Sequence, residues 1–271
     1  MMSTDQFSNL RISLVENVVQ VAFSRAPVNA VNQAMYREIR DFFSNVDTLV
    51  PTARAIVLTG EGKHFCAGND LDEFAGLTSE NSPGRMKEVH QAFTAIAECS
   101  IPVIAAVHGV ALGTGLCLAA SCDFVLAADD ARFGVPELTV GVMGAARHLQ
   151  RLVPQGLARW MYYTSETIPA ERLYDLGGVV AVVAREELLR AALDQARVIT
   201  RHSAQSLRFA KYAMDTIEFM ELGPGYAFEQ SLTNRFADHP DSREAMLAIR
   251  ENRAPIYSHE WTPIVRDKEA P

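Results

Sequence analysis

The stretch from Ile101 to Cys122 constrains the fold most, because these 22 residues include no Asp, Glu, Lys or Arg. That length matches a membrane-spanning helix. However, a proline follows the first residue, and Gly109, Gly113 and Gly115 interrupt the second half. They divide the stretch into IPVIAAV, a turn and GLCLAAS. This pattern favours a buried strand, a loop and the start of a buried helix over a membrane span.

Strands alternate with amphipathic helices on both sides of this stretch. Residues 10–23 alternate with a period of two around a central Glu-Asn pair, which predicts a β-hairpin. Apolar residues at helical spacing predict helices over 32–47 and 85–99, and the apolar runs at 54–59 and 123–128 predict buried strands. The alternation predicts an α/β fold with a largely parallel sheet covered by helices.

The last third of the chain has a helical pattern throughout. Breaks between its helices are expected at Gly223–Gly225 and at His239-Pro240. We therefore expect a core over residues 1–185, a helical region over 186–257 and a loose tail over 258–271.

The composition excludes several classes of protein. With 25 Lys and Arg against 33 Asp and Glu, the net charge is -8, which argues against nucleic-acid binding through phosphate contacts. The four cysteines form no CxxC pair and the seven histidines no HxxxH pair, so no metal site is expected. The first residues lack the features of a signal peptide, which predicts a reduced, cytoplasmic location with no membrane partner.

Two segments share one motif, in which a buried strand ends in a glycine-containing turn. The first is CAGND (66–70) and the second is ALGTG (111–115). Such turns leave backbone N–H groups unpaired, and two of them can converge on a carbonyl oxygen that becomes negative during a reaction. Each turn alone is also compatible with a simple tight connection. The second turn lacks the third glycine of a dinucleotide-binding fingerprint.

Three segments carry a resemblance to a known family: HFCAGNDLDEF (64–74), the run over 101–142, and ENRAPIY (251–257). They resemble the enoyl-CoA hydratase/isomerase family, the crotonase superfamily, and the resemblance covers roughly residues 10–257. It implies a spiral of repeated ββα units with a C-terminal helical trimerisation region, in a homotrimer or a dimer of trimers. It also implies an acyl-CoA substrate, with coenzyme A as part of that substrate and no separate cofactor.

The resemblance also implies roles for individual residues. The backbone N–H groups of Asn69 and Thr114 would donate to the thioester oxygen, and the Ala67 carbonyl would face the adenine. Lys211 matches a lysine near the CoA phosphates, although a solvated helix lysine is an equal alternative. Glu137 matches one of the two glutamates that the hydratases place on opposite sides of a water molecule.

The sequence departs from the hydratase pattern at Cys117, which stands at the position of the other glutamate. A cysteine of ordinary pKa is mostly a neutral thiol near pH 7 and orients water poorly, so the departure weakens the case for hydration. It is also compatible with an inert core thiol. A single carboxylate, Glu137, can still move a proton between two carbons, as the isomerases of the family do.

A second departure follows downstream, where Arg147 and His148 replace small residues of a run resembling PGAGG. Both are candidates for contacting the acyl group, unless they point away from the site. Cys117, Met143 and His90 are further candidates for the acyl pocket, and for His90 a role as a satisfied core histidine is the alternative.

The predicted function is double-bond isomerisation or hydration of an enoyl-CoA through a thioester enolate held in a backbone oxyanion hole. Two alternatives remain open on the same scaffold. One is thioester hydrolysis or C–C cleavage, and the other is an acyl-CoA-binding relative with impaired catalysis.

Overall fold

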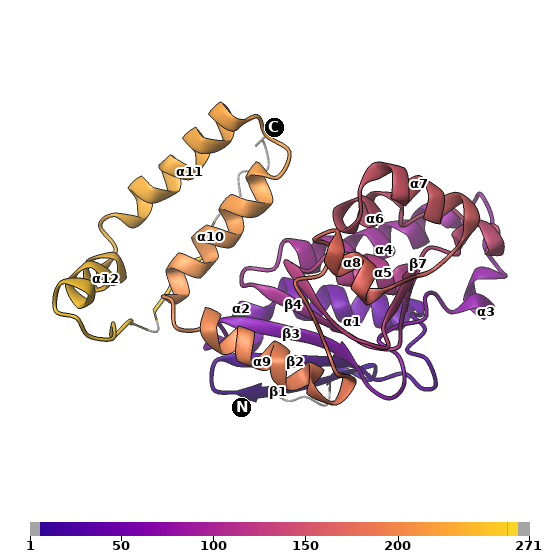
Figure 1. Cartoon of the computed structure of the whole chain (residues 1–271), viewed down its shortest axis with the longest axis horizontal. Helices are drawn as coiled ribbons and strands as arrows, with labels where there is room; N and C mark the ends of the chain where they lie inside the picture. Colours follow the sequence, from indigo (N-terminus) through magenta and orange to yellow (C-terminus); the bar gives the residue numbers. More distant parts are fainter. Residues whose placement is uncertain (1–5, 259, 265–271) are drawn as a thin grey trace.

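The computed structural model describes residues 6–258 and 260–264, and it has an α/β fold built on two sheets (Figure 1). Within these residues the larger sheet has six strands in the order β1-β2-β3-β4-β6-β9, and the smaller sheet has the order β5-β7-β8. The strands are β1 Leu10–Val15, β2 Val18–Phe23, β3 Ala55–Gly60, β4 Val103–Val107, β5 Val110–Leu112, β6 Phe124–Ala128, β7 Arg132–Gly134, β8 Ile168–Pro169 and β9 Ala181–Val183.

Helices connect and cover these strands. The α-helices are α1 Gln33–Ser44, α2 Val46–Leu49, α3 Leu71–Phe74, α4 Ser82–Ala97, α5 Thr114–Ala120, α6 Ala146–Leu152, α7 Gln155–Thr164, α8 Ala170–Asp175, α9 Leu188–Ile199, α10 Ala204–Ile217, α11 Leu222–Phe236 and α12 Pro240–Arg250. Two short 3-10 helices are η2 Glu137–Val140 and η3 Arg185–Glu187.

The predicted hairpin and parallel sheet are confirmed. β1 and β2 are antiparallel, with Leu10 opposite Phe23. The pairs β2 with β3, β3 with β4, β4 with β6 and β6 with β9 are all parallel. Parallel neighbours need a crossover, which α1 provides between β2 and β3 and α4 between β3 and β4. α1 buries Met35, Tyr36 and Ile39, so its apolar stripe faces the core as its spacing predicts.

The uncharged stretch forms β4, β5 and α5. The buried strand and the buried helix agree with the prediction, whereas the short strand β5 lies where a turn was expected. Every residue of β4 and of α5 is buried. Gly115 lies where α5 passes the turn after β3, and a Cβ there would lie 2.2 Å from the carbonyl oxygen of Cys66. Only glycine permits this approach. Across the described residues, we find no helix with both the length and the apolar character that crossing a membrane requires.

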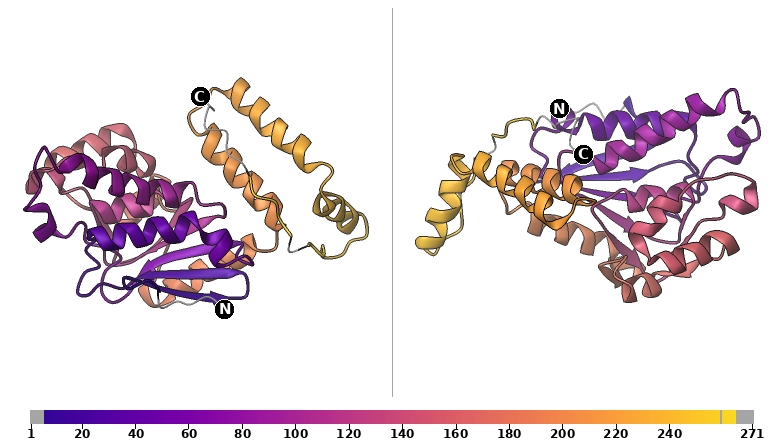
Figure 2. Two further views of the ribbon diagram at one scale, coloured as in Figure 1. Left: turned by 180° about the vertical axis from the view of Figure 1, so that it is seen from behind. Right: turned by 90° about the horizontal axis from the view of Figure 1, so that it is seen from above.

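Helices cover both faces of the larger sheet. α1, α4 and α5 pack on one face, and α9 packs on the other through Leu188, Ala192 and Ala196. The core therefore extends past the predicted boundary at residue 185, because α9 is one of its layers. Figures 1 and 2 show α10, α11 and α12 projecting from this body as an arm, so the separate helical region begins at α10.

Buried charged side chains fasten the arm to the core. Arg208 on α10 donates to Asp47 at 2.5 Å, and the Lys211 ammonium lies 2.9 Å from both carboxylate oxygens of Asp123. The Lys211 side chain is only 2% exposed. If Lys211 moved away, the partly buried carboxylate of Asp123 would lose the opposite charge that compensates it. Lys211 therefore makes a structural ion pair, and this placement corrects both expectations for it, the contact with CoA phosphates and the solvated lysine.

Two further expectations for the C-terminal region are corrected. The residues 223–225 do not separate two helices but lie in the first turn of α11, where Pro224 is tolerated because the first N–H groups of a helix have no intrahelical acceptor. In the predicted loose tail, the Arg208 guanidinium lies over the Trp261 ring at 3.9 Å, and the Trp261 indole N–H donates to the Pro51 carbonyl. Trp261 is thus packed on the protein, whereas 259 and 265–271 lie outside the described residues.

Candidate active site

Four of the predicted site residues line one cavity of about 420 Å³: Ala67, Asn69, Thr114 and Glu137. They come from three segments, namely the loop between β3 and α3, the first residue of α5, and the first residue of η2. β5 and β7 are parallel, so the segments with Thr114 and Glu137 that follow them leave the same edge of the smaller sheet. In α/β proteins ligands commonly bind at such an edge.

Backbone hydrogen bonds hold the two glycine-containing turns together. The Cys66 N–H donates to the Val110 carbonyl, and the Leu112 N–H donates to the Cys66 carbonyl, each at 3.1 Å. The Cys66 turn is thereby bridged to β5 in parallel. Both bonds lie next to the cavity lining, and they hold the Cys66 backbone against β5.

The backbone N–H groups of Asn69 and Thr114 have no protein acceptor within residues 6–258 and 260–264. Both residues line the cavity, and Thr114 is 4% exposed. Buried N–H groups are nearly always paired, so an unpaired one facing a cavity is suited to a ligand oxygen. The geometry is compatible with the predicted pair of donors for a carbonyl oxygen, and their catalytic role stays a prediction.

Tyr36 on α1 connects these two residues, and the sequence analysis did not single it out. Its hydroxyl donates to Oδ1 of Asn69 at 2.6 Å and lies 2.8 Å from Oγ1 of Thr114. The side chain is fully buried. Its two partners lie 33 and 78 residues further along the chain. The helical spacing of the segment therefore indicated only a core position.

The Glu137 side chain lies beside the second turn. Gly113 has a φ of +51°, a conformation that favours glycine, and a Cβ there would lie 2.7 Å from Oε1 of Glu137 and would displace this carboxyl group. Glu137 is 8% exposed, and within the described residues its Oε2 has no hydrogen-bond partner. Burial raises the pKa of Glu137 to about 7. The carboxyl group is therefore able both to accept and to donate a proton near neutral pH.

Cys117 is buried on α5, one turn after Thr114. Burial, and after it the negative charge of Glu137, raises the pKa of the Cys117 thiol well above its usual value. The thiol is therefore neutral near pH 7 and is not activated as a nucleophile. Cys117 is not among the residues that line the cavity, which favours the inert core thiol over an acyl-pocket contact.

The rest of the cavity wall is largely apolar. Its apolar side chains include Val28, Leu71, Phe74, Leu112, Val140 and Val142. Asp70 also lines the cavity, but its carboxylate accepts from Arg25 at 2.6 Å, so this negative charge is paired. Such a wall suits an acyl chain, and Glu137 is left as its unpaired buried carboxyl group.

The other acyl-pocket candidates lie outside this cavity. His90 is exposed on α4, which excludes the satisfied core histidine as well, and Met143 is 77% exposed. Arg147 points toward the end of α10, where its guanidinium lies 4.4 Å from the centre of the Phe219 ring. His148 packs edge to face on Phe93, and burial lowers the pKa of His148 to about 4, so its ring is neutral. None of the four lines the cavity.

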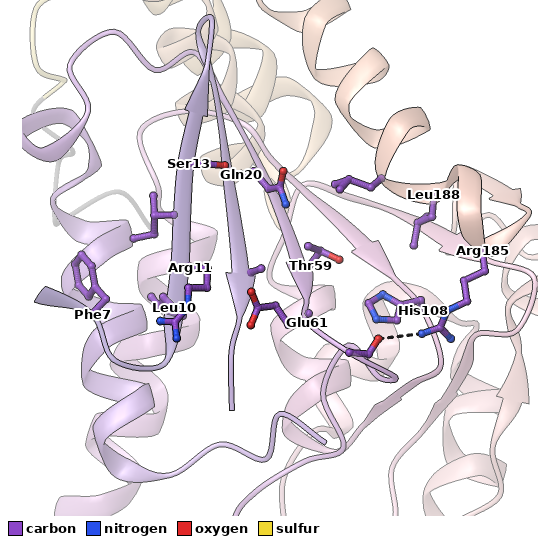
Figure 3. A pocket seen from close by; sticks show the side chains of 15 residues that line it. Phe7, Leu10, Arg11, Ser13, Gln20, Thr59, Glu61, His108, Arg185 and Leu188 are labelled. Atoms are coloured by element: carbon purple, nitrogen blue, oxygen red, sulfur yellow. Dashed lines mark hydrogen bonds between the residues drawn. The ribbon is translucent and has the colours of Figure 1, made fainter. Parts of the chain in front are cut away.

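A larger hollow of about 670 Å³ lies between the N-terminal hairpin and the start of α9 (Figure 3). Its charged side chains have partners, and Glu61 accepts a hydrogen bond from the Ser24 hydroxyl. Arg185 donates to the Gly62 and Lys63 carbonyls and forms an ion pair with Asp130. None of the predicted site residues lines it, so we place the candidate active site in the smaller cavity. Among the described residues, no cluster of three or more His, Cys, Asp or Glu side chains is arranged to hold a metal ion.

Known proteins resemble this chain in sequence. The profile of the enoyl-CoA hydratase/isomerase family matches residues 14–260. A (7aS)-7a-methyl-1,5-dioxo-2,3,5,6,7,7a-hexahydro-1H-indene-carboxyl-CoA hydrolase of Mycobacterium tuberculosis is 37% identical over 222 residues, which are 80% of this chain and 87% of the relative. A 2,3-dehydroadipyl-CoA hydratase of Escherichia coli is 34% identical over 260 residues, which are 92% of this chain and 98% of the relative.

Solved structures resemble it in fold. An enoyl-CoA hydratase of Bacillus anthracis superposes with a TM-score of 0.88 at 29% identity, covering 93% of this chain and all of the other (100%). The profile match spans most of the chain, and the relatives align along nearly their whole lengths. The chain therefore belongs to the enoyl-CoA hydratase/isomerase family, the crotonase superfamily.

Proposed function

We propose that this acyl-CoA enzyme stabilises a thioester enolate and moves a double bond within an enoyl-CoA. The thioester oxygen accepts hydrogen bonds from the N–H groups of Asn69 and Thr114, and the Ala67 carbonyl faces the adenine. Each such donor contributes roughly 3 kcal/mol of barrier lowering. Glu137 takes a proton from the carbon next to the thioester or from its vinylogue, and the C–H electrons move into the carbonyl. The protonated Glu137 then returns the proton to the other carbon.

One observation carries this proposal: the buried carboxyl group of Glu137 shares a cavity with two backbone N–H groups that have no acceptor within the described residues. Its pKa of about 7 suits a group that acts first as base and then as acid. Enolate formation places charge on the oxygen at the N–H groups and a proton on the carboxyl group, so both features serve the same step.

Isomerisation is favoured over hydration because of Cys117. Hydration of an enoyl-CoA by the two-glutamate arrangement needs a second carboxylate to orient water, and here that position holds a buried thiol whose pKa is raised. A neutral thiol is a weak donor and acceptor. Isomerisation needs neither the second carboxylate nor water.

Hydrolysis is the second candidate, and the relatives favour it specifically. The 37% identical protein of M. tuberculosis and a 34% identical protein of Rhodococcus jostii carry the same name, that of a CoA hydrolase. In such a reaction Glu137 would remove a proton from water, and the N–H pair would stabilise the oxyanion that forms.

Incubation with 2-enoyl-CoA and 3-enoyl-CoA thioesters in heavy water distinguishes these reactions, with the products followed by chromatography and mass spectrometry. A displaced alkene, with or without deuterium, supports isomerisation. A product heavier by one water establishes hydration, and released CoA or a cleaved carbon skeleton establishes hydrolysis or C–C cleavage. The matched variant Glu137→Gln should abolish each of these reactions. Binding of acyl-CoA without turnover by the parent would indicate an acyl-CoA-binding protein with impaired catalysis.

We also infer that the arm formed by α10, α11 and α12 assembles the chain into a homotrimer or a dimer of trimers. The resemblance to the family implies this assembly. Large apolar side chains exposed on and beside these helices support it: Met214, Phe219, Leu222 and Ile249. Sedimentation velocity of the purified protein tests the inference, and a monomer at micromolar concentration would contradict it.

A further inference from the structure

Tyr36 is the one tyrosine side chain of the described residues that contacts both turns of the candidate site. Its hydroxyl donates to Oδ1 of Asn69, at 2.6 Å. A phenol has a single O–H donor, so the 2.8 Å contact with Thr114 is a bond that the Thr114 hydroxyl donates to Tyr36. The hydrogen bonds thus run in one direction, from Thr114 through Tyr36 to Asn69.

This relay joins two residues that line the cavity and whose backbone N–H groups have no acceptor within the described residues. Asn69 belongs to the turn after β3, whereas Thr114 begins α5. The backbone hydrogen bonds between these turns involve Cys66 and β5, so the relay is the contact that joins the two donor-bearing residues themselves. We propose that Tyr36 is a positioning residue, which sets the distance and direction between the two N–H donors through this relay.

The surroundings of Tyr36 make it suited to this role. The side chain is fully buried and packs edge to face with Phe93, with the ring centroids 6.1 Å apart, so its ring position is fixed by packing. Burial raises the pKa of the Tyr36 hydroxyl, which therefore stays protonated and able to donate. Misplacing a reacting group or donor by about 1 Å can lower a rate roughly 100-fold, so a fixed spacing matters for the reaction.

The inference rests on the proposed function, because it assigns Tyr36 to the oxyanion hole of that reaction. The inference extends that function by naming the residue that positions the two N–H donors of the oxyanion hole. Tyr36 touches neither substrate nor reacting atoms in this arrangement, so its loss should change the polarisation of the bound thioester and the turnover number more than substrate affinity.

The test compares three variants of the full chain with the parent. Tyr36→Phe removes only the hydroxyl group, and Thr114→Val removes the other hydroxyl of the relay while leaving the backbone N–H. Ser121→Ala is the matched control, since Ser121 is the C-cap of α5 and its buried hydroxyl donates to the Cys117 carbonyl at 2.8 Å, with no hydrogen bond to Asn69 or Thr114.

The first readout is the infrared C=O stretch of bound butanoyl-CoA labelled with carbon-13 at the thioester carbonyl. The parent should shift this band to lower frequency relative to free ligand. Tyr36→Phe and Thr114→Val should reverse much of the shift, while Ser121→Ala should leave it unchanged.

The second readout is turnover. We expect kcat to fall roughly 10- to 100-fold in both relay variants, with KM changing less than about threefold. The double variant should be no worse than the poorer single variant.

The outcomes separate the two proposals. If the parent neither shifts the thioester band nor exchanges the α-hydrogen of butanoyl-CoA, the proposed function fails, and the role of Tyr36 fails with it. If the parent shifts the band and exchanges the α-hydrogen, and Tyr36→Phe and Thr114→Val give the same band shift and the same kcat as the parent, the proposed function stands and the role of Tyr36 is overturned. If Tyr36→Phe does not fold, Thr114→Val alone decides: parent-like values for this variant would overturn the proposal.

Discussion

Glu137 should lower the stability of the protein above neutral pH, because the site keeps its carboxyl group away from water. Burial raises the pKa of Glu137 from 4.5 to about 7. Between these values the unfolded chain has lost the proton while the folded chain retains it, so unfolding releases a proton. The free energy of unfolding therefore falls as pH rises through this window, and the full penalty is present above pH 7.

The structure gives the size of this effect. At about 1.4 kcal/mol for each pKa unit, the difference between 4.5 and about 7 corresponds to a penalty of about 3 kcal/mol at pH 8. At pH 5 the same relation leaves a penalty of only about 1 kcal/mol. Glu137→Gln carries no ionisable group. It should therefore be more stable than the parent by about 3 kcal/mol at pH 8 and by about 1 kcal/mol at pH 5.

Urea denaturation of both proteins at pH 5 and pH 8, at one fixed protein concentration, measures this difference. Contributions of other titrating groups cancel in the comparison. Glu80→Gln serves as the control, since Glu80 is exposed and should give the parent's pH dependence. If the parent and Glu137→Gln lose the same stability between pH 5 and pH 8, Glu137 ionises as readily in the folded protein as in water. The assignment of Glu137 as a proton shuttle near neutral pH would then lose its physical basis.

Three further predictions concern neighbouring positions. Cys117→Ala should keep turnover within about threefold of the parent, because a neutral thiol supplies neither base nor nucleophile, and a steady-state assay on an active enoyl-CoA measures this. Gly113→Ala should lower kcat at least roughly tenfold, because its Cβ would lie 2.7 Å from Oε1 of Glu137 at a φ of +51°; unchanged kinetics would contradict this close approach. Lys211→Met should lower the free energy of unfolding by roughly 3 kcal/mol by leaving Asp123 unpaired. Calorimetric titration of Lys211→Met should show the parent's acyl-CoA affinity, and a large loss of affinity would indicate that Lys211 contacts CoA after all.

Local patterns predicted the elements that lie near one another along the chain. The glycines within residues 101–122 predicted that β4 and α5 are separate elements, because each glycine marks a turn or a close approach, but they did not predict the short strand β5 between them. The period-two alternation over 10–23 predicted the hairpin, because in β1 the buried Leu10 and Ile12 alternate with the exposed Arg11 and Ser13. Glu137 was found through its motif, since spacing alone does not reveal that its carboxyl group is buried.

Contacts between distant residues could not be predicted in this way. Tyr36 occupies an ordinary apolar position on α1, and its role depends on partners in two later turns. Lys211 looks like any helix lysine until Asp123, 88 residues earlier, is placed beside it. Likewise, an amphipathic stripe such as that of α9 does not reveal whether it packs on the sheet or on other helices. The boundary at residue 185 was placed too early for that reason.

The apolar wall of the cavity links the pKa, the stability and the reaction of this site. Because that wall raises the pKa of Glu137, it stabilises the protonated state that the reaction must pass through. The same wall disfavours water, which isomerisation does not need and hydrolysis does. Water admitted beside Glu137 would solvate the carboxylate and return its pKa toward 4.5, weakening the acid that isomerisation requires. The buried thiol of Cys117 acts in the same direction, since a second carboxylate there would bring water with it. A largely apolar cavity in which Glu137 is the one buried carboxyl group with an unpaired oxygen among the described residues is therefore suited to proton transfer. A hydrolase in the same cavity would have to bind its water beside the apolar wall that raises the pKa of Glu137.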